Sequence, residues 1–271
     1  MPELPEVEVV KRALTVIFNA HSEIEKVVWR RPDLRFPLPL KLLKKWKKVT
    51  VGPIERRAKY LLLHSAAGSL VCHLGMTGNF RLRESPDDVR THDHVEFWFA
   101  NGAVLVFEDP RRFGFFQEWP GDWNQVTREA LGFEPLEPAW TAAVLKSQVK
   151  NRKTPIKTFL MDQRIVVGIG NIYASEILFR AGVRPSRPAH KVSRLECDKI
   201  VQISREVLLA AIRHGGSSIR DFYSPDQGQG NFQTSHLVYN REKQACVICE
   251  TPIRKTVQGG RSTFWCPRCQ T

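Results

Sequence analysis

Four of the six cysteines are placed to bind a metal ion. Cys246 and Cys249 are separated by two residues, and after sixteen intervening residues Cys266 and Cys269 repeat that spacing. Thiolates at this spacing are typical of one tetrahedral structural zinc site. Disulfides or an iron–sulfur cluster are the alternatives, and a reducing cytosol argues against disulfides. Four protein ligands leave no open coordination position, so this zinc would stabilise a fold and take no part in catalysis.

The segment between the two cysteine pairs contains a turn. The adjacent Gly259 and Gly260 supply it, and we therefore expect a hairpin with Arg261 at its tip. Cys72 and Cys197 lie outside the four-cysteine pattern. We expect both to be ordinary buried residues.

A glycine turn at residues 167–171 precedes a predicted helix. A dinucleotide-binding fingerprint does not fit, because Tyr173 occupies the third glycine position and no acidic residue follows in a βαβ setting. Backbone N–H groups at a helix that begins near Asn171 would instead make a phosphate site. An ordinary helix-packing element is the other interpretation. Basic residues lie just upstream: Lys153, Lys157 and Arg164.

The amino terminus holds a possible nucleophile. Pro2 follows Met1, and a small second residue permits removal of the initiator methionine. The freed secondary amine would have a pKa near ~8 and a usable unprotonated fraction at neutral pH. Its attack on a sugar C1′ would give an iminium, a form of covalent catalysis. Glu3 is placed beside it as an acid, with Glu6 one helical turn onward, although Pro and Glu also simply begin helices well.

Two glycine-rich segments hold residues that could enter a DNA duplex. Met76 lies in the first, at 73–76, and Arg111 and Phe113 lie in the second, at 109–114. Apolar wedges combined with an arginine are what a base-flipping enzyme inserts into the base stack. Burial of Met76 and Phe113 in a core is the alternative interpretation.

Strands are predicted for the first half of the chain and helices for the second. A helix near the start is predicted from apolar residues on one face: Val7, Val10, Ala13, Leu14 and Ile17. Alternation through residues 95–99, the Asn101-Gly102 turn and the apolar run 103–107 predict a β-hairpin. Ser193 and Glu196 form a capping box before a long helix that ends at Gly215-Gly216.

The chain of 271 residues has a formal net charge of +13. Residues 1–130 carry +3 and residues 131–271 carry +10. A basic half favours a polyanionic partner, most often nucleic acid. No apolar stretch is long enough for a membrane span, and Glu3, Glu6 and Glu8 argue against a secretory signal, so a cytosolic protein is expected.

Seven motifs occur in an order that resembles one family. They are MPELPEV at 1–7, RRAKY at 56–60, HLGM at 73–76, HDH at 92–94, DPRRFG at 109–114, GNIY at 170–173 and the four-cysteine tail. Over essentially its whole length the chain is similar to bacterial formamidopyrimidine-DNA glycosylase, the 8-oxoguanine repair enzyme. It departs at Phe133, where proline is more usual, and at Arg152, where lysine is common.

The resemblance implies an α+β fold in three parts. An N-terminal β-sandwich with flanking helices would occupy residues 1–130 and a helical helix–two-turn–helix domain residues 131–235. A zinc-finger hairpin would occupy residues 236–271. Damaged double-stranded DNA would run through the cleft between the domains, and a monomer in the bacterial cytoplasm, associated with the nucleoid, is expected.

The resemblance also assigns roles to single residues. Pro2 would be the nucleophile, Glu3 the acid that protonates the opening sugar, Lys59 a general acid in β-elimination, and Arg261 an aid to δ-elimination. Phosphate contacts are implied for His92, Arg152 and Asn171, with Lys157 a nearby helper. The gap left by the flipped base would be filled by Met76, Arg111 and Phe113. The loop near 217–229 would close over that base.

The resulting prediction is a bifunctional DNA glycosylase and abasic-site lyase that removes oxidised purines, 8-oxoguanine and formamidopyrimidines. A related glycosylase for oxidised pyrimidines is the alternative within the same class. A non-catalytic DNA-binding protein would be expected to have replaced Pro2, Glu3 or Lys59, and all three are present. A zinc-ribbon protein that binds a partner would leave the amino-terminal motif unexplained.

Overall fold

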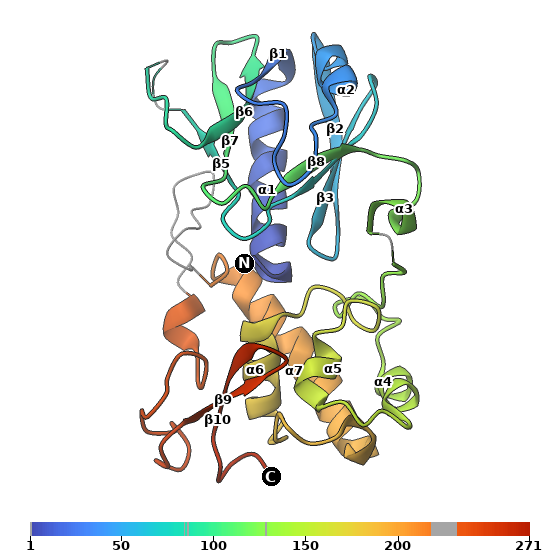
Figure 1. Cartoon of the computed structure of the whole chain (residues 1–271), viewed down its shortest axis with the longest axis vertical. Helices are drawn as coiled ribbons and strands as arrows, with labels where there is room; N and C mark the ends of the chain where they lie inside the picture. The colour runs from blue at the N-terminus through green and yellow to red at the C-terminus, as the bar shows by residue number, and fades with distance from the viewer. Residues whose placement is uncertain (1, 84, 86, 128, 218–231) are drawn as a thin grey trace. The chain divides into compact units, whose positions relative to one another are not determined.

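The computed structural model describes residues 2–83, 85, 87–127, 129–217 and 232–271 (Figure 1). The chain divides into two compact units. Unit 1 comprises Met1–Arg128 and His214–Gln233, and unit 2 comprises Glu129–Arg213 and Thr234–Thr271. The loop expected near 217–229 lies outside the described residues except for Ser217, as does Met1. The domain boundaries at 130 and 235 stay predictions.

Unit 1 contains a long helix and an eight-stranded antiparallel sheet. Its helices are α1 (Leu4–His21), α2 (Leu40–Lys45) and α3 (Trp123–Thr127). Its strands are β1 (Glu23–Trp29), β2 (Val49–Arg57), β3 (Tyr60–Ser65), β4 (Leu70–His73), β5 (Asn79–Leu82), β6 (Asp93–Phe99), β7 (Val104–Glu108) and β8 (Phe115–Glu118). The strand order is β5-β7-β6-β1-β2-β3-β4-β8. The predicted hairpin at 95–107 is confirmed as β6 and β7.

The sheet consists of two halves that share one core. Strands β1 and β2 are joined through only two residue pairs, so the sheet turns there and its halves become the layers of a sandwich. Phe116 of β8 packs edge-on against Phe107 of β7, at a ring distance of 4.9 Å, and tilted against Phe97 of β6, at 6.2 Å. The buried face of α1 joins the same core, as its helical spacing predicts: Val7, Val10, Leu14 and Ile17.

Unit 2 is helical, with a two-stranded hairpin at its carboxyl end. Its helices are α4 (Ala142–Val149), α5 (Ile156–Leu160), α6 (Asn171–Arg180) and α7 (Arg194–Arg213). A short 3-10 turn spans Ala189–Lys191, and a second, Phe232–Ser235, reaches unit 2 only with its last two residues. The hairpin pairs β9 (Arg254–Gln258) with β10 (Arg261–Trp265). The capping box of α7 is confirmed, since the Ser193 and Glu196 side chains each accept the other residue's backbone N–H. The α+β class is therefore confirmed.

Among the helices of the described residues, none is both long enough and apolar enough to span a bilayer.

Candidate active site and nucleic-acid interface

Pro2 and Glu3 lie buried directly before α1, with Glu3 as the N-cap residue of that helix. The Glu6 carboxylate accepts the backbone N–H of Glu3 through Oε2 at 2.8 Å and that of Ser217 through Oε1 at 2.8 Å. A Cβ added to Gly216 would lie only 3.0 Å from Glu6 Oε1, so the chain passes closely over this carboxylate. Glu6 also completes the capping box of the helix. Together these contacts fix the direction of the segment that carries Pro2.

Lys59 lies in a two-residue loop between β2 and β3. Arg57 and Tyr60 are the last paired residues of the two strands, which leaves Ala58 and Lys59 as the loop. Ala58 has a φ of 55°, a left-handed conformation that costs a non-glycine residue energy and is retained only where the surroundings fix it. The Lys59 residue is only 7% exposed, so its ammonium group is presented from a constrained, largely enclosed position.

His73, at the end of β4, is the neutral neighbour of this lysine. Burial, together with the positive charges of Lys59 and Arg35, lowers the pKa of His73 to about 3. The ring stacks on Phe115 at 5.4 Å, and its Nδ1 accepts the backbone N–H of Gly75 at 3.0 Å. At neutral pH the imidazole is therefore uncharged, with its proton on Nε2.

Met76, Arg111 and Phe113 lie on two loops that pack against each other in unit 1. A Cβ on Gly75 would meet backbone atoms of Phe113 at 2.3 Å, so only glycine permits this close approach. Met76 is 37% exposed and Phe113 41% exposed, which contradicts the alternative interpretation that both are core residues. The Arg111 guanidinium lies over the Phe113 ring at 4.8 Å from its centroid. An exposed cluster of this composition is suited to stacking against bases.

The buried carboxylate of Asp109 organises the second of these loops. It accepts the Thr77 hydroxyl at 2.5 Å and the backbone N–H groups of Gly114 at 2.7 Å and Arg111 at 3.3 Å. The exposed His92 adjoins the same loop, because its carbonyl accepts the Asp109 backbone N–H at 3.1 Å. The sequence places Asp109 in a motif, but only its contacts identify it as the residue that holds the loop.

In unit 2, Asn171 and Lys157 form one hydrogen-bonded group with the zinc-finger hairpin. Asn171 is the first residue of α6, and its Nδ2 donates to the Ser262 carbonyl at 3.0 Å. Lys157 is 1% exposed, and its Nζ donates to Asn171 Oδ1 at 2.5 Å and to the Thr263 hydroxyl at 2.8 Å. This geometry favours an indirect role for Lys157, through Asn171, in line with the helper role that the resemblance implies for it.

Arg152 and Arg261 line one hollow of about 420 Å³ in unit 2. Arg152 lies in the turn after α4, and Arg261 begins β10 at the tip of the hairpin. The two loop residues Gly259 and Gly260 have φ angles of 54° and 72°, which the tight hairpin turn requires. Both arginines are exposed, so their guanidinium groups can reach an anion outside the protein.

Asp162 contributes the negative charge of this hollow. Its carboxylate pairs with Arg164 at 2.7 Å. The hydrogen bond from that guanidinium holds the pKa of Asp162 below its ordinary value, against the opposing effect of burial. The carboxylate is therefore ionised and neutralised by its neighbour, and the arginines of the hollow keep a net positive charge.

The four predicted zinc ligands converge at the base of the hairpin. Their Sγ atoms all lie within 4.8 Å of one another, with Cys246 and Cys269 at 3.9 Å and Cys249 and Cys266 at 3.4 Å. A tetrahedron of thiolates at about 2.3 Å from a zinc ion has S–S edges of about 3.8 Å, so the arrangement fits this metal. Cys72 and Cys197 are buried elsewhere, as expected.

Glu176 attaches the zinc-finger part to α6. Its buried carboxylate accepts the backbone N–H groups of Leu237, Val238 and Tyr239 at 2.9 to 3.0 Å. The same helix begins at Asn171, and its Phe179 packs in the apolar cluster beneath the hairpin. The position of Asn171 therefore depends, through α6, on the folded zinc site.

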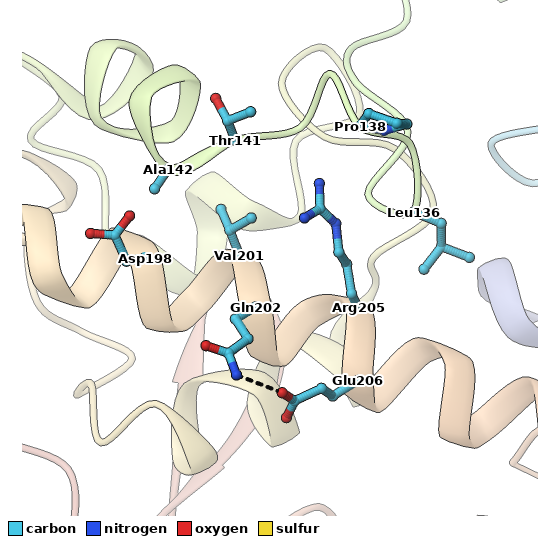
Figure 2. A pocket seen from close by; sticks show the side chains of 9 residues that line it. All are labelled: Leu136, Pro138, Thr141, Ala142, Asp198, Val201, Gln202, Arg205 and Glu206. Atoms are coloured by element: carbon cyan, nitrogen blue, oxygen red, sulfur yellow. Dashed lines mark hydrogen bonds between the residues drawn. The ribbon is translucent and has the colours of Figure 1, made fainter.

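A hollow of about 780 Å³ lies elsewhere in unit 2, between α7 and the segment that leads into α4 (Figure 2). Arg205 extends from α7 toward this segment, and its Nη2 donates to the carbonyls of Glu137 at 3.1 Å and Trp140 at 2.6 Å. The hollow contains none of the predicted site residues. At this hollow the segment is held to α7, since the Nη2 group of Arg205 donates to two of its backbone carbonyls.

Comparison with known families covers all three parts of the chain. The model described as Formamidopyrimidine-DNA glycosylase N-terminal domain matches residues 1–116, and that described as Formamidopyrimidine-DNA glycosylase H2TH domain matches residues 131–223. The model described as zinc finger found in FPG and IleRS matches residues 243–271. The zinc-finger match and the convergence of the four thiols together establish one structural zinc ion.

Individual relatives are similar over their whole length. The formamidopyrimidine-DNA glycosylase of Bdellovibrio bacteriovorus is 44% identical over 270 residues, which is all of both chains. The MutM (Fpg) crystal structure from Thermus thermophilus has a TM-score of 0.86 at 37% identity, covering 99% of this chain and 98% of that one.

The Lactococcus lactis Fpg is known in complex with DNA. Its complex with a Fapy-dG-containing DNA has a TM-score of 0.89 at 28% identity and covers 99% of this chain and 100% of that one. The same enzyme is also known with an oxidised-pyrimidine-containing DNA. Likeness to relatives of this kind extends from the amino-terminal motif to the zinc finger, and the chain therefore belongs to the formamidopyrimidine-DNA glycosylases, DNA-repair enzymes with glycosylase and abasic-site lyase activity.

Proposed function

We propose that this glycosylase excises oxidised purines, 8-oxoguanine and formamidopyrimidines, through a Schiff base at Pro2 followed by β,δ-elimination. The observation that carries the proposal is the buried start of α1, where the Glu6 carboxylate accepts the backbone N–H of Glu3, next to Pro2, and that of Ser217. A fixed amine beside a carboxyl group supplies the nucleophile and the acid that glycosidic attack requires. The three-part domain division, a monomeric state and action in the cytoplasm are part of the same proposal.

The first half of the reaction opens the sugar. After removal of Met1, the Pro2 nitrogen forms a bond to C1′ as the bond from C1′ to the damaged base breaks, and the proton that the Pro2 nitrogen gives up leaves with the base. Glu3 gives a proton to O4′ as the C1′–O4′ bond opens, which leaves an iminium between Pro2 and C1′. The amine must be unprotonated to attack, and an α-amino pKa near ~8 makes this fraction available at neutral pH.

The second half of the reaction cleaves the strand. The iminium acidifies the C2′ proton, and its loss expels the 3′ phosphate, to which Lys59 gives a proton. A further elimination, aided by Arg261, expels the 5′ phosphate, and water then releases the sugar remnant and restores the amine. The zinc site, closed by four thiolates, would hold the hairpin that carries Arg261 and supply no hydrolytic water.

The remaining site residues would bind the DNA. We assign phosphate contacts to three polar residues and one indirect helper: His92, Arg152 and Asn171, with Lys157 behind Asn171. The exposed loop cluster would occupy the space left by the flipped base: Met76, Arg111 and Phe113. This assignment is supported by the exposure of the cluster and by the basic hollow that Arg152 and Arg261 line.

Borohydride trapping on 8-oxoguanine duplex DNA tests the mechanism. We expect a covalent adduct whose peptide mass maps to Pro2, since borohydride reduces the iminium to a stable amine. A chain that carries an uncleaved residue before Pro2 should bind the DNA and give no adduct, because acylation removes the nucleophilicity of the Pro2 nitrogen. An adduct at Lys59, or full activity of the extended chain, would refute the amino-terminal mechanism.

Oxidised pyrimidines are the second candidate substrates. The Lactococcus lactis relative is known with an oxidised-pyrimidine-containing DNA, which favours testing that lesion class here. Parallel single-turnover excision of an 8-oxoguanine and an oxidised pyrimidine from the same duplex would rank the two. Faster release of the pyrimidine would replace the purine proposal and leave the Pro2 chemistry unchanged.

A further inference from the structure

One guanidinium group in unit 1 contacts both the helix that begins after Pro2 and the loop that carries Lys59. Arg56 lies near the end of β2, and its Nε donates to Oε2 of Glu8 on α1 at 2.9 Å. Its Nη1 donates to the carbonyl of Ala58 at 3.0 Å. Ala58 directly precedes Lys59 in the loop. Glu8 follows Glu3 along the helix by little more than one turn.

The Arg56–Glu8 contact is sheltered from solvent. The two side chains are 10% and 13% exposed. Burial alone would raise the pKa of Glu8, but the hydrogen bond from Arg56 and the charges of Lys11 and Arg56 outweigh it, and the pKa lies below its ordinary value. The pair is therefore ionised at neutral pH and is screened less than a surface ion pair.

The second contact acts on a strained turn. Ala58 has a φ of 55°, and this conformation directs the chain into Lys59. Because its guanidinium is planar with donors in a fixed fork, Arg56 can hold the Glu8 carboxylate and the Ala58 carbonyl at once, whereas the point charge of a lysine cannot reproduce both directions. Helix and loop are thereby held at a fixed separation by one rigid group.

We infer that Arg56 is a positioning residue, which with Glu8 sets the Lys59 loop relative to the helix that begins after Pro2. The inference rests on the proposed function, since it requires Pro2 and Lys59 to act on the same sugar. Pro2 attack needs only the helix end, whereas elimination needs both the helix end and Lys59. Loss of the Arg56–Glu8 link should therefore slow elimination more than attack, because misplacement by about 1 Å can cost roughly a hundredfold in rate.

The test compares Arg56→Gln, Glu8→Gln and the double variant with the full-length wild type. Each protein is assayed for the rate of borohydride-trapped adduct on lesion DNA and for the single-turnover rate of strand cleavage at a preformed abasic site. We expect each single variant to lower the cleavage rate by about tenfold or more relative to the adduct rate. The double variant should be no slower than the worse single variant, because both changes remove the same link.

Arg12→Ala is the matched control. Arg12 contacts the same Glu8 carboxylate, at 3.3 Å, but its side chain is 61% exposed and the contact does not reach the loop. This variant should keep both rates. The double variant also guards against unfolding, because removal of both charges leaves neither one buried without its partner.

The possible results separate the inference from the proposed function. Equal losses of adduct formation and cleavage, or losses that add in the double variant, would overturn the positioning role and leave the Pro2 mechanism intact. A matching defect in Arg12→Ala would overturn it as well, because loss of any positive charge paired with Glu8 would then be sufficient. Failure of the wild type to form an adduct at Pro2 would overturn the proposed function, and this inference with it.

Discussion

Lys157 should affect DNA binding without contributing a phosphate charge of its own. Its Nζ is buried and donates to Asn171 Oδ1 at 2.5 Å, to Thr263 Oγ1 at 2.8 Å and to the Ser262 carbonyl at 3.3 Å. Lys157→Met keeps an unbranched side chain as far as Cε and removes the ammonium group with its donors. We then expect the Asn171 side chain and the hairpin to lose their fixed positions together.

The expected loss of stability follows from these contacts. A hydrogen bond from a charged donor contributes roughly 1.5 to 3 kcal/mol, and two of the three distances are short. Part of this is offset, because the variant no longer buries an ammonium group. We expect the free energy of unfolding to fall by about 3 kcal/mol, which in a protein of this size lowers Tm by roughly 6 to 12 °C.

The dependence of DNA affinity on salt concentration distinguishes a lysine that contacts phosphate directly from one that acts through Asn171. Loss of one well-placed hydrogen bond to phosphate, through Asn171, should weaken binding about tenfold. The slope of log affinity against log salt should stay the same, because no phosphate loses a cationic partner. Arg152→Gln is the comparison, since loss of an exposed guanidinium from the DNA interface should flatten that slope by about 0.9.

A slope change in Lys157→Met equal to that in Arg152→Gln would refute the indirect role of Lys157. That result would mean that Lys157 reaches a phosphate directly. Unchanged stability and affinity in Lys157→Met would likewise show that its three contacts do not hold Asn171. Folding of each variant is checked by circular dichroism before titration.

Three further predictions concern the loop cluster, the zinc site and the buried histidine. Phe113→Ala should slow excision of 8-oxoguanine from duplex DNA far more than cleavage at a preformed abasic site. Unstacking an intact base costs a few kcal/mol, and an abasic site has no base to unstack. Equal losses on both substrates would indicate general weakening of DNA binding instead. Cys249→Ser should lose zinc and DNA binding while unit 1 stays folded, because structural zinc contributes on the order of 10 kcal/mol to a small subdomain; metal analysis and a binding assay check this, and retained zinc would contradict it. The depressed pKa of His73, about 3, means that the unfolded chain takes up a proton below pH ~6.5 while the folded chain does not, so stability should fall as pH drops from 6.5 toward 3. Unfolding of His73→Gln should lose part of this pH dependence, and a wild-type profile in that variant would show that His73 titrates normally.

Features that depend on local sequence could be predicted. The spacing of the four cysteines identified the zinc site, because two short loops bring each pair of thiols to one point whatever the rest of the chain does. The apolar spacing in α1 and the Ser193-Glu196 capping box gave the two long helices, because helical contacts join residues three or four apart. The order of the motifs along the chain is by itself sufficient to indicate the family.

Other features depend on residues that are distant in the sequence, and only the tertiary structure decided them. Lys157 is a plain basic residue in the sequence, and its burial follows from Thr263, 106 positions away. Met76 and Phe113 have core-like side chains, and their exposure depends on how Gly75 and Asp109 hold two loops together. A side chain's chemistry is local, but its access to solvent and its partners are set by packing of the whole fold.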